Sequence, residues 1–337
     1  MREILQTLLE GRSLSESEAQ AMMRAVIAGE VADVQVGAML GALRSRLETE
    51  AELVGCARAI LEHCSALSTG VDDAVDVCGT GGDGAQTFNI STTVAFVLAG
   101  GGVPVAKHGN RAVSSSCGSA DVLEELGVDV HGDAEAVTRS LQTASFSFLF
   151  APDHHQVMRN VGPLRTALGV RTTFNLLGPL MNPARVRRQV VGIFDARLLE
   201  TMARALQTLG ATDAMVVASQ DGLDELSVSA PSTVAHLHNN KVSLFEVTPA
   251  DAGVAHHPIA SIRGGDARDN ARIAQEVLSG IPGGPREVVV LNAALGFMVA
   301  DRATSIAEGV SLARRSIDSG NAGAVLEKLR EISRAAA

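Results

Sequence analysis

From residue 74 onward the sequence repeats one pattern, in which a short apolar run is followed by a segment with helical spacing. The apolar runs span residues 74–78, 103–106, 146–151, 189–194 and 214–218, and the helical segments lie near 91–100, 119–127, 134–143 and 197–209. Because consecutive parallel strands need a long crossover that a helix usually supplies, this alternation predicts a largely parallel sheet flanked by helices. We therefore expect an α/β protein.

Two later segments differ from this pattern. Residues 233–237 and 242–247 read as strands joined by the polar residues 238–241, which is typical of a hairpin. An antiparallel strand is therefore expected to join the sheet. From about residue 267 to 337 the spacing is again helical.

Residues 1–66 show helical patterns only, with capping boxes at Ser15–Glu18 and Thr49–Glu52. We expect a small helical domain over 1–66 and a large α/β domain over 67–337. Residues 163–187 are rich in proline and glycine, so this segment should cross between the domains, part of it joining the small one in space. Ligands usually bind in such clefts.

Small side chains at Gly37, Ala38 and Gly41 lie on one predicted helix and permit close approach of a second helix. The spacing leaves open whether that helix belongs to this chain or to a partner chain.

Composition excludes several classes of protein. With 46 % hydrophobic and 20 % charged residues, the chain of 337 residues has enough apolar side chains for a core and is not disordered. Its formal net charge of −10 repels polyanions, so any phosphate site must be local and no nucleic-acid partner is expected.

The four cysteines form no CxxC pair and no His/Cys spacing typical of zinc sites, so reduced thiols without structural zinc are expected. The sequence has no signal-peptide pattern and no run of about 18 apolar residues, which predicts a cytoplasmic protein that does not enter a membrane.

The strongest motif is the glycine-rich loop at 76–84, which follows the first predicted strand directly. Glycines allow backbone N–H groups to approach an anion closely, and residues 89–92 cap the next helix, whose N-terminal end favours negative charge. A pyrophosphate would fit this loop, although a tight turn between strand and helix is the alternative. The motif is neither GxxxxGK[ST] nor GxGxxG, which argues against ATPases and dehydrogenases.

Residues 107–121 follow the second predicted strand and include Lys107, Arg111 and a serine cluster. Carboxyl ends of neighbouring parallel strands converge on one crevice, so one ligand could contact both loops. The positive charges and hydroxyl groups suit phosphate oxygens, with an ordinary solvated turn as the alternative.

Asp224 and Glu225 are adjacent carboxylates shortly after the fifth predicted strand. Such a pair repels itself unless a cation or solvent intervenes, and oxygen ligands shared with phosphates are typical of Mg²⁺ sites. An exposed acidic turn is the alternative.

These three segments, together with residues 171–184, resemble the motifs of the anthranilate phosphoribosyltransferases, in order and over nearly the whole chain. The stretches around His154 and His155 and at 263–267 are also similar. The resemblance implies transfer of phosphoribosyl from 5-phosphoribosyl-1-pyrophosphate to anthranilate, Mg²⁺ as cofactor and a homodimer. Ser116 and Cys117 stand where a Lys-Ser pair is common, which leaves the detail of donor binding open, and Gln156 stands where proline is frequent.

The resemblance also assigns roles to residues. Catalysis is expected from Lys107, Asp83 and Asn110. The donor is expected to contact Gly79, Gly82, Asp83, Thr87, Asn89, Ile90, Ser91, Thr92, Lys107, Ser115 and Ser119. Anthranilate is expected to contact Gly79, His108, Asn110, Arg165, Gly178 and Pro179. Mg²⁺ is expected to be held by Ser91, Asp224 and Glu225. The chemistry agrees, because an arginine binds a carboxylate bidentately and an asparagine both donates and accepts.

Two other functions remain as alternatives. Pyrimidine nucleoside phosphorylases share the expected architecture, but they carry a lysine-histidine-serine motif where this chain has Lys107-His108-Gly109. A non-catalytic, nucleic-acid-binding relative is disfavoured by the net charge of −10 and by the intact Asp224-Glu225 pair.

Overall fold

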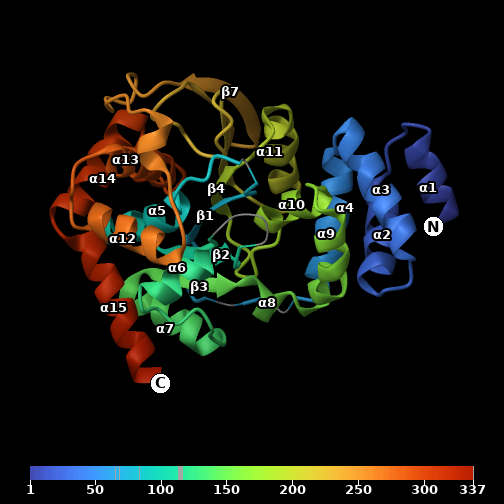
Figure 1. The fold of residues 1–337 in the computed structure, drawn as a ribbon, viewed down its shortest axis with the longest axis horizontal. Helices are drawn as coiled ribbons and strands as arrows, with labels where there is room; N and C mark the ends of the chain where they lie inside the picture. Colours follow the sequence, from blue (N-terminus) through green and yellow to red (C-terminus); the bar gives the residue numbers. More distant parts are fainter. Residues whose placement is uncertain (65, 68, 83, 113–116, 337) are drawn as a thin grey trace.

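A computed structural model describes residues 1–64, 66–67, 69–82, 84–112 and 117–336. Its centre is a seven-stranded sheet with the order β3-β2-β1-β4-β5-β6-β7, in which β3 through β5 are parallel and β6 and β7 are antiparallel additions (Figure 1). The strands are β1 Val75–Gly79, β2 Val105–Gly109, β3 Phe146–Phe150, β4 Arg188–Gly192, β5 Asp213–Ser219, β6 Ser232–His238 and β7 Lys241–Val247. The expected α/β class is confirmed.

The apolar run at 103–106 predicted the second strand, but β2 begins and ends later, at Val105 and Gly109. Lys107 and His108 belong to the strand itself and pair in parallel register with Phe148 and Leu149 of β3. The polar side chains suggested a loop, but the ladder hydrogen bonds on this buried strand outweigh that preference. Both side chains therefore start from rigid backbone.

The hairpin has a shorter turn than predicted. His238 and Lys241 pair as the last residues of the two strands, so only Asn239 and Asn240 make the turn. Both have positive φ, 50° and 60°, the conformation of a type I′ turn, which asparagine tolerates better than most residues.

The two faces of the sheet are covered by different helices. One face packs against α5, α6 and the C-terminal helices. Val75 and Val77, two residues apart on β1, both belong to this core. Strand β4 divides its residues between the faces, since Val190 contacts this core and Val191 contacts the core formed with α11 and the N-terminal helices. The helices of these layers are α5 Ile90–Gly100, α6 Ser119–Glu125, α7 Ala134–Ala144, α11 Leu199–Thr208, α12 Ala267–Leu278, α13 Gly284–Val299, α14 Ile306–Asp318 and α15 Asn321–Ala336.

The N-terminal helices form a separate bundle at one end of the molecule, blue in Figure 1. They are α1 Arg2–Leu9, α2 Glu16–Ile27, α3 Asp33–Arg46 and α4 Glu50–Leu61. Both predicted capping boxes are present, at the starts of α2 and α4. The closest helix approach is at Gly55 of α4, where a Cβ would lie 2.3 Å from the Glu16 carbonyl oxygen of α2.

The segment predicted to cross between the domains contains two short helices, α9 Gly162–Leu168 and α10 Thr173–Leu177. Figure 1 shows both beside α4 and not on the sheet. Leu164, Phe174 and Leu177 share the apolar core of the bundle. The crossing segment therefore packs as part of the helical end of the molecule.

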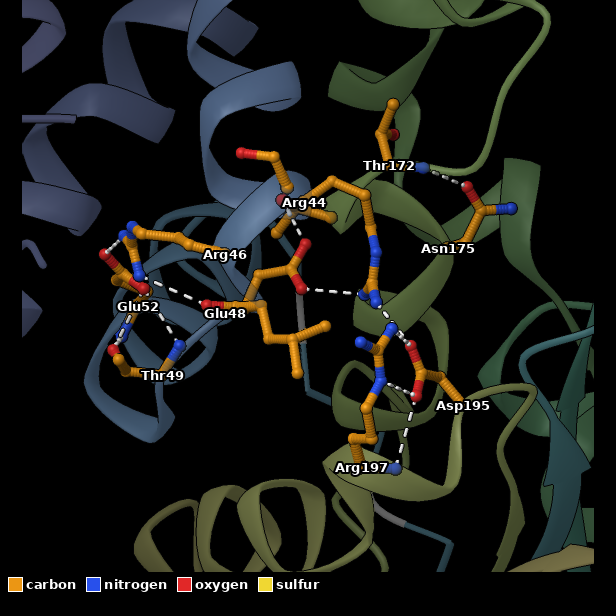
Figure 2. A network of polar contacts seen from close by, with 12 residues as sticks. Arg44, Arg46, Glu48, Thr49, Glu52, Thr172, Asn175, Asp195 and Arg197 are labelled. Atoms are coloured by element: carbon orange, nitrogen blue, oxygen red, sulfur yellow. Dashed lines mark hydrogen bonds and ion pairs between the residues drawn. The ribbon is translucent and has the colours of Figure 1, made fainter. Parts of the chain in front are cut away.

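A polar network also links the bundle to the α/β part (Figure 2). Arg44 of α3 pairs with the buried Glu48 at 2.8 Å and with Asp195, which follows β4, at 2.7 Å. Glu48 also accepts a hydrogen bond from the Thr173 hydroxyl at 2.9 Å. The three contacts fix α3, α10 and the end of β4 relative to one another.

Among the described residues, no helix has the length and apolarity needed to cross a membrane. Cys56, Cys64, Cys78 and Cys117, all in the described part of the chain, form no disulfide bond.

Candidate active site

A cavity of about 620 Å³ opens at the carboxyl ends of β1 and β2 and extends to the crossing segment. It is lined by every predicted site residue that the structure describes: Gly79, Gly82, Thr87, Asn89, Ile90, Ser91, Thr92, Lys107, His108, Asn110, Ser119, Arg165, Gly178, Pro179, Asp224 and Glu225. Asp83 and Ser115 lie outside the described residues. The segments are distant in sequence, so the fold itself brings them together.

The glycine-rich loop has the conformation that its sequence requires. Gly81, Gly82 and Gly84 have φ of 64°, 75° and 76°, values that residues with a Cβ rarely adopt. The Gly81 N–H donates to Asp224 Oδ2 at 2.8 Å, and a Cβ on Gly79 would lie 2.5 Å from the same oxygen. Glycine at 79 therefore allows the Asp224 carboxylate to lie against the end of β1.

Helix α5 begins beside this loop. The helix begins within residues 89–92 as predicted, with Asn89 in the N-cap position, but the Asn89 side chain makes no capping hydrogen bond. Its backbone N–H donates instead to Asn270 Oδ1 at 3.2 Å. Thr87, two residues before Asn89, forms an isolated antiparallel β-bridge with Arg263, so the stretch at 263–267 supports this loop. Ser91 and Thr92 in the first turn line the cavity, where the helix end favours an anion.

Lys107 is buried at the junction of β1, β2 and α5, with only 2 % of its surface exposed. Its Nζ donates to the Val77 carbonyl oxygen at 2.5 Å and to Ser91 Oγ at 3.2 Å. Burial lowers the pKa of Lys107, and the nearby Asp76 carboxylate opposes that shift. The ammonium group is therefore held by fixed acceptors at the edge of the cavity.

Asp76 connects three segments around this lysine. Its carboxylate accepts hydrogen bonds from the His108 N–H at 3.2 Å and from Asn182 Nδ2 at 2.8 Å. Burial raises the pKa of Asp76. Asn182 also donates to the Ala106 carbonyl oxygen at 2.9 Å, so the crossing segment is fixed to both β1 and β2. The sequence analysis gave Asn182 no role.

The loop after β2 offers less free charge than predicted. Arg111 forms ion pairs with Asp121 at 3.1 Å and Glu124 at 2.5 Å, so its charge is balanced locally. Asn110 is exposed at the cavity, and its Oδ1 accepts the Arg111 N–H at 2.7 Å. The Ser119 hydroxyl donates to the Asn110 carbonyl oxygen at 3.2 Å. Lys107, on β2 itself, forms no ion pair among the described residues, so its charge is less balanced than that of Arg111.

Asp224 and Glu225 are not an exposed turn. Asp224 is 9 % exposed, and both residues face the cavity beside the glycine-rich loop. A Cβ on Gly192 of β4 would lie 1.6 Å from the Asp224 carbonyl oxygen, so glycine there is required for the close approach. Burial raises the pKa of the nearby Cys78 thiol, the Asp76 carboxylate adds to this shift, and Glu225 and Asp224 contribute less. Two oxygen ligands beside a phosphate-type loop fit a hard cation such as Mg²⁺.

The other end of the cavity contains two buried histidines. His108 Nδ1 pairs with the Gly178 carbonyl oxygen at 3.2 Å, and His155 Nε2 pairs with that of Met181 at 2.9 Å. Burial lowers the pKa of His108 to about 3 and that of His155 to about 4, so both rings are neutral near pH 7. With each paired nitrogen donating its proton, the remaining ring nitrogens, His108 Nε2 and His155 Nδ1, are buried without a hydrogen-bond partner in the described part of the chain.

Arg165 on α9 supplies the positive charge at this end. Its guanidinium lies 5.6 Å from the centre of the Phe174 ring, and partial burial lowers its pKa while the group stays charged. No carboxylate lies within ion-pair distance of Arg165 among residues 1–64, 66–67, 69–82, 84–112 and 117–336. A ligand carboxylate would complete its contacts.

Several lining residues were missed by the sequence analysis, among them His155, Met158, Arg159, Phe174 and Met181. His155 had a usable signal, because it lies shortly after the end of β3, and His108 lies near the end of the neighbouring strand β2. The apolar lining residues had no sequence signal, because the same side chains would also fit an ordinary hydrophobic core.

Comparisons with known proteins agree with this architecture. Residues 71–323 match the a/b domain of a glycosyl transferase family, and residues 2–64 match the helical bundle domain of a glycosyl transferase family. The chain belongs to this class of transferases.

Within it, the chain belongs to the anthranilate phosphoribosyltransferase family. It is 48 % identical to the anthranilate phosphoribosyltransferase of Symbiobacterium thermophilum, with 99 % of this chain and 98 % of the relative covered. The enzyme of the same name from Phenylobacterium zucineum is also 48 % identical, over 98 % of this chain and 97 % of its own.

Solved structures give the same result. The anthranilate phosphoribosyltransferase from Thermus thermophilus superposes with a TM-score of 0.91 at 41 % identity, covering 98 % of this chain and 99 % of its own. The enzyme from Saccharomyces cerevisiae, in complex with PRPP and Mg, gives 0.89 at 28 % identity, with 99 % and 97 % covered.

Proposed function

We infer that this chain transfers the 5-phosphoribosyl group from 5-phosphoribosyl-1-pyrophosphate to the amino group of anthranilate, releasing pyrophosphate. One observation carries this assignment. A single cavity joins a glycine-rich anion loop with carboxylates at one end to a partly buried arginine and neutral histidines at the other. A phosphorylated donor fits the first end and an aromatic acid the second. The product is N-(5-phosphoribosyl)anthranilate, formed in the second step on the route from chorismate to tryptophan.

At the donor end, the chain's contribution is to hold the pyrophosphate in place. Backbone N–H groups around Gly82 and the first turn of α5 can donate to phosphate oxygens, and Lys107 supplies fixed positive charge at their edge. Ser91, Asp224 and Glu225 would hold Mg²⁺. When bound, this ion neutralises charge on the pyrophosphate. Because Lys107 is already ordered by Val77 and Ser91, little reorganisation is needed as that charge develops.

The other donor contacts implied by the resemblance complete this end: Gly79, Asp83, Thr87, Asn89, Ile90, Thr92, Ser115 and Ser119. Asp83 is also assigned a catalytic role beside Lys107 and Asn110. These roles remain proposals.

At the acceptor end, Arg165 can bind the anthranilate carboxylate, while Asn110 orients the amino group. An aryl amine is neutral near pH 7 and needs no base before it attacks, so positioning is the main requirement. His108 and His155 are neutral and therefore do not repel or protonate the amine. Gly79, Gly178 and Pro179 shape the pocket around the ring. Attack on the anomeric carbon proceeds with inversion through an oxocarbenium-like transition state.

The relatives and structural neighbours named above favour this function over a pyrimidine nucleoside phosphorylase or a non-catalytic nucleic-acid binder. Purified protein with donor and Mg²⁺ should consume the fluorescence of anthranilate. Cleavage of uridine or thymidine with phosphate, without turnover of anthranilate, would overturn the assignment.

We also propose that the chain forms a homodimer through its helical bundle. Gly37 packs internally, since its Cβ position is 3.4 Å from Leu168. Ala38 is exposed, and a Cβ on Gly41 would meet no described atom within 4 Å, so a helix of a second copy could approach there. Sedimentation should give about twice the 34.9 kDa chain mass, and a strict monomer at micromolar concentration would contradict it.

Two further parts of the proposal concern organisation and location. The division into 1–66 and 67–337, with part of 163–187 joined to the small domain, is supported by the packing of α9 on α3 and of α10 on α3 and α4. A cytoplasmic location is supported by the four cysteines, which form no disulfide bond among the described residues.

A further inference from the structure

Two imidazoles and one carboxylate meet on the antiparallel part of the sheet, away from the cavity. Asp213 begins β5, and His238 on β6 is its direct partner, while His236 precedes His238 by two residues on the same strand. Directly paired residues share a face of the sheet, as do residues two apart on one strand. All three side chains therefore project from one face.

The three side chains already share one carboxylate. Asp213 Oδ1 accepts a hydrogen bond from His236 Nε2 at 3.0 Å, and Oδ2 accepts one from His238 Nδ1 at 2.5 Å. The three potential ligand atoms all lie within 4.8 Å of one another. A zinc-type ion with bonds of about 2.0–2.2 Å needs ligand atoms roughly 3–3.5 Å apart, so small movements would admit it.

We propose that Asp213, His236 and His238 form a second metal site, which takes a borderline divalent cation of the zinc type. Two imidazole nitrogens and one carboxylate oxygen are a ligand set that suits zinc, whereas Mg²⁺ prefers oxygen ligands alone. None of the three lines the active-site cavity, so the site is separate from the carboxylates at 224 and 225. On binding, each neutral ring would ligate the ion through the nitrogen that now faces Asp213, His236 Nε2 and His238 Nδ1, and would carry its single proton on the other ring nitrogen.

The exposure of the three side chains rises from Asp213 to His238, which leaves a fourth coordination position open to solvent. The side chains of Asp213, His236 and His238 are 8 %, 20 % and 49 % exposed. Water can therefore reach the exposed side of His238 and complete a tetrahedral site, while the carboxylate stays anchored in the sheet. Phe245 of β7 lies against His236 with ring centres 6.4 Å apart and limits the motion of that ring.

The expected function of the site is to link β5 to β6 and so stabilise the hairpin. The ligands are held by paired strands, so binding has little backbone to order. Lys241 pairs directly with His238 across the hairpin and places a positive charge on the same face, which weakens binding. Lys241→Gln should therefore tighten binding about 2- to 3-fold.

The test is titration of the full-length protein with Co²⁺, a spectroscopic substitute for Zn²⁺, in wild type and in His236→Gln/His238→Gln. His256→Gln/His257→Gln is the matched control. It also removes two histidines, which are adjacent in sequence, but from a loop outside β5 and β6. We expect tetrahedral ligand-field bands at one equivalent in wild type and control, with at least about 10-fold weaker binding in the first variant.

Three results would overturn the proposal. These are no binding by wild type, equal binding by the His236/His238 variant, and a thiolate-to-cobalt charge-transfer band, which would indicate a cysteine site.

A second measurement separates binding from folding. Saturating Zn²⁺ should raise the melting temperature of wild type and control by about 2 °C or more and leave the His236/His238 variant unchanged. If that variant does not fold without metal, Asp213→Asn replaces it, because the amide keeps a hydrogen-bond acceptor but loses the charge. Undiminished Co²⁺ binding by Asp213→Asn would equally reject the site.

Discussion

The two ends of the cavity are built in different ways. The donor end consists of loops that follow parallel strands, and its groups are held by backbone, as when Gly81 donates to Asp224 and Lys107 to Val77. The acceptor end consists of side chains on short helices of the crossing segment, such as Arg165, and on strand β2, such as His108. On the proposed assignment, the highly charged donor would be held mainly by backbone groups and Lys107, and the flat aromatic acid by side chains from several segments.

The largest expected effect is at the carboxylates of the donor end. Asp224→Asn with Glu225→Gln should lower turnover by about 100-fold or more, because ligands for a charge-stabilising cation are lost. Turnover against Mg²⁺ concentration measures this, and circular dichroism checks the fold, since Asp224 is buried and also bonds to Gly81. Asp221→Asn in the same loop is the matched control, as Asp221 does not line the cavity. An unchanged Mg²⁺ dependence in the folded double variant would show that these residues do not hold the metal.

Arg165 tests whether the acceptor end acts independently. Arg165→Gln should raise the KM for anthranilate about 10- to 100-fold and leave the KM for the donor unchanged, because a bidentate carboxylate contact is lost. Arg159→Gln, at a more exposed position of the same cavity, should change either constant less than about 3-fold. Steady-state kinetics with each substrate varied in turn distinguish the two. Equal losses for donor and acceptor in Arg165→Gln would remove the proposed division of the cavity.

Two glycines give a matched comparison of the ends. Gly79, which is expected to contact both substrates, lies against the donor-end carboxylate: Gly79→Ala places a Cβ 2.5 Å from Asp224 Oδ2, so the carboxylate must move and the KM for the donor should rise about 10-fold, more than the KM for anthranilate. Gly178→Ala meets no described atom within 4 Å and has φ of −48°, so the fold should be unaffected and any change should appear with anthranilate. The same kinetic measurements apply. A donor effect from Gly178→Ala as large as that of Gly79→Ala would contradict the separation.

The smallest effect concerns stability at low pH. His155 has a folded pKa of about 4, below the ordinary value of 6.5, so the unfolded state binds its proton first as the pH falls. The buried, neutral His155 ring therefore makes its full contribution to the free energy of unfolding above pH ~6.5. This contribution is lost as the pH falls from ~6.5 to about 4. His155→Gln should melt with a shallower pH dependence in this window, by up to about 1.4 kcal/mol per pH unit. Identical slopes for wild type and variant, from melting curves, would show that His155 is not buried neutral.

Particular residues show how far sequence reasoning reached. The glycine-rich loop, Lys107 and the Asp224-Glu225 pair could be identified because glycine, lysine and adjacent carboxylates have few roles at strand ends. The charge of Arg111 was misread, since Asp121 and Glu124 lie 10 and 13 residues away and only the fold makes them ion-pair partners. Asn182 was missed because an asparagine in a proline-rich segment has many possible partners.

By itself, the sequence determined the elements and their order, because hydrophobic periodicity, capping boxes and glycine punctuation are local properties. It also determined which loops could bind an anion, since that depends on backbone freedom next to a strand. Only the tertiary structure decided burial and partnership. Asp224 became a buried carboxylate beside Gly79 and Gly192, and Asp213 met two histidines of the neighbouring strand, because contacts between distant segments depend on packing that no local pattern encodes.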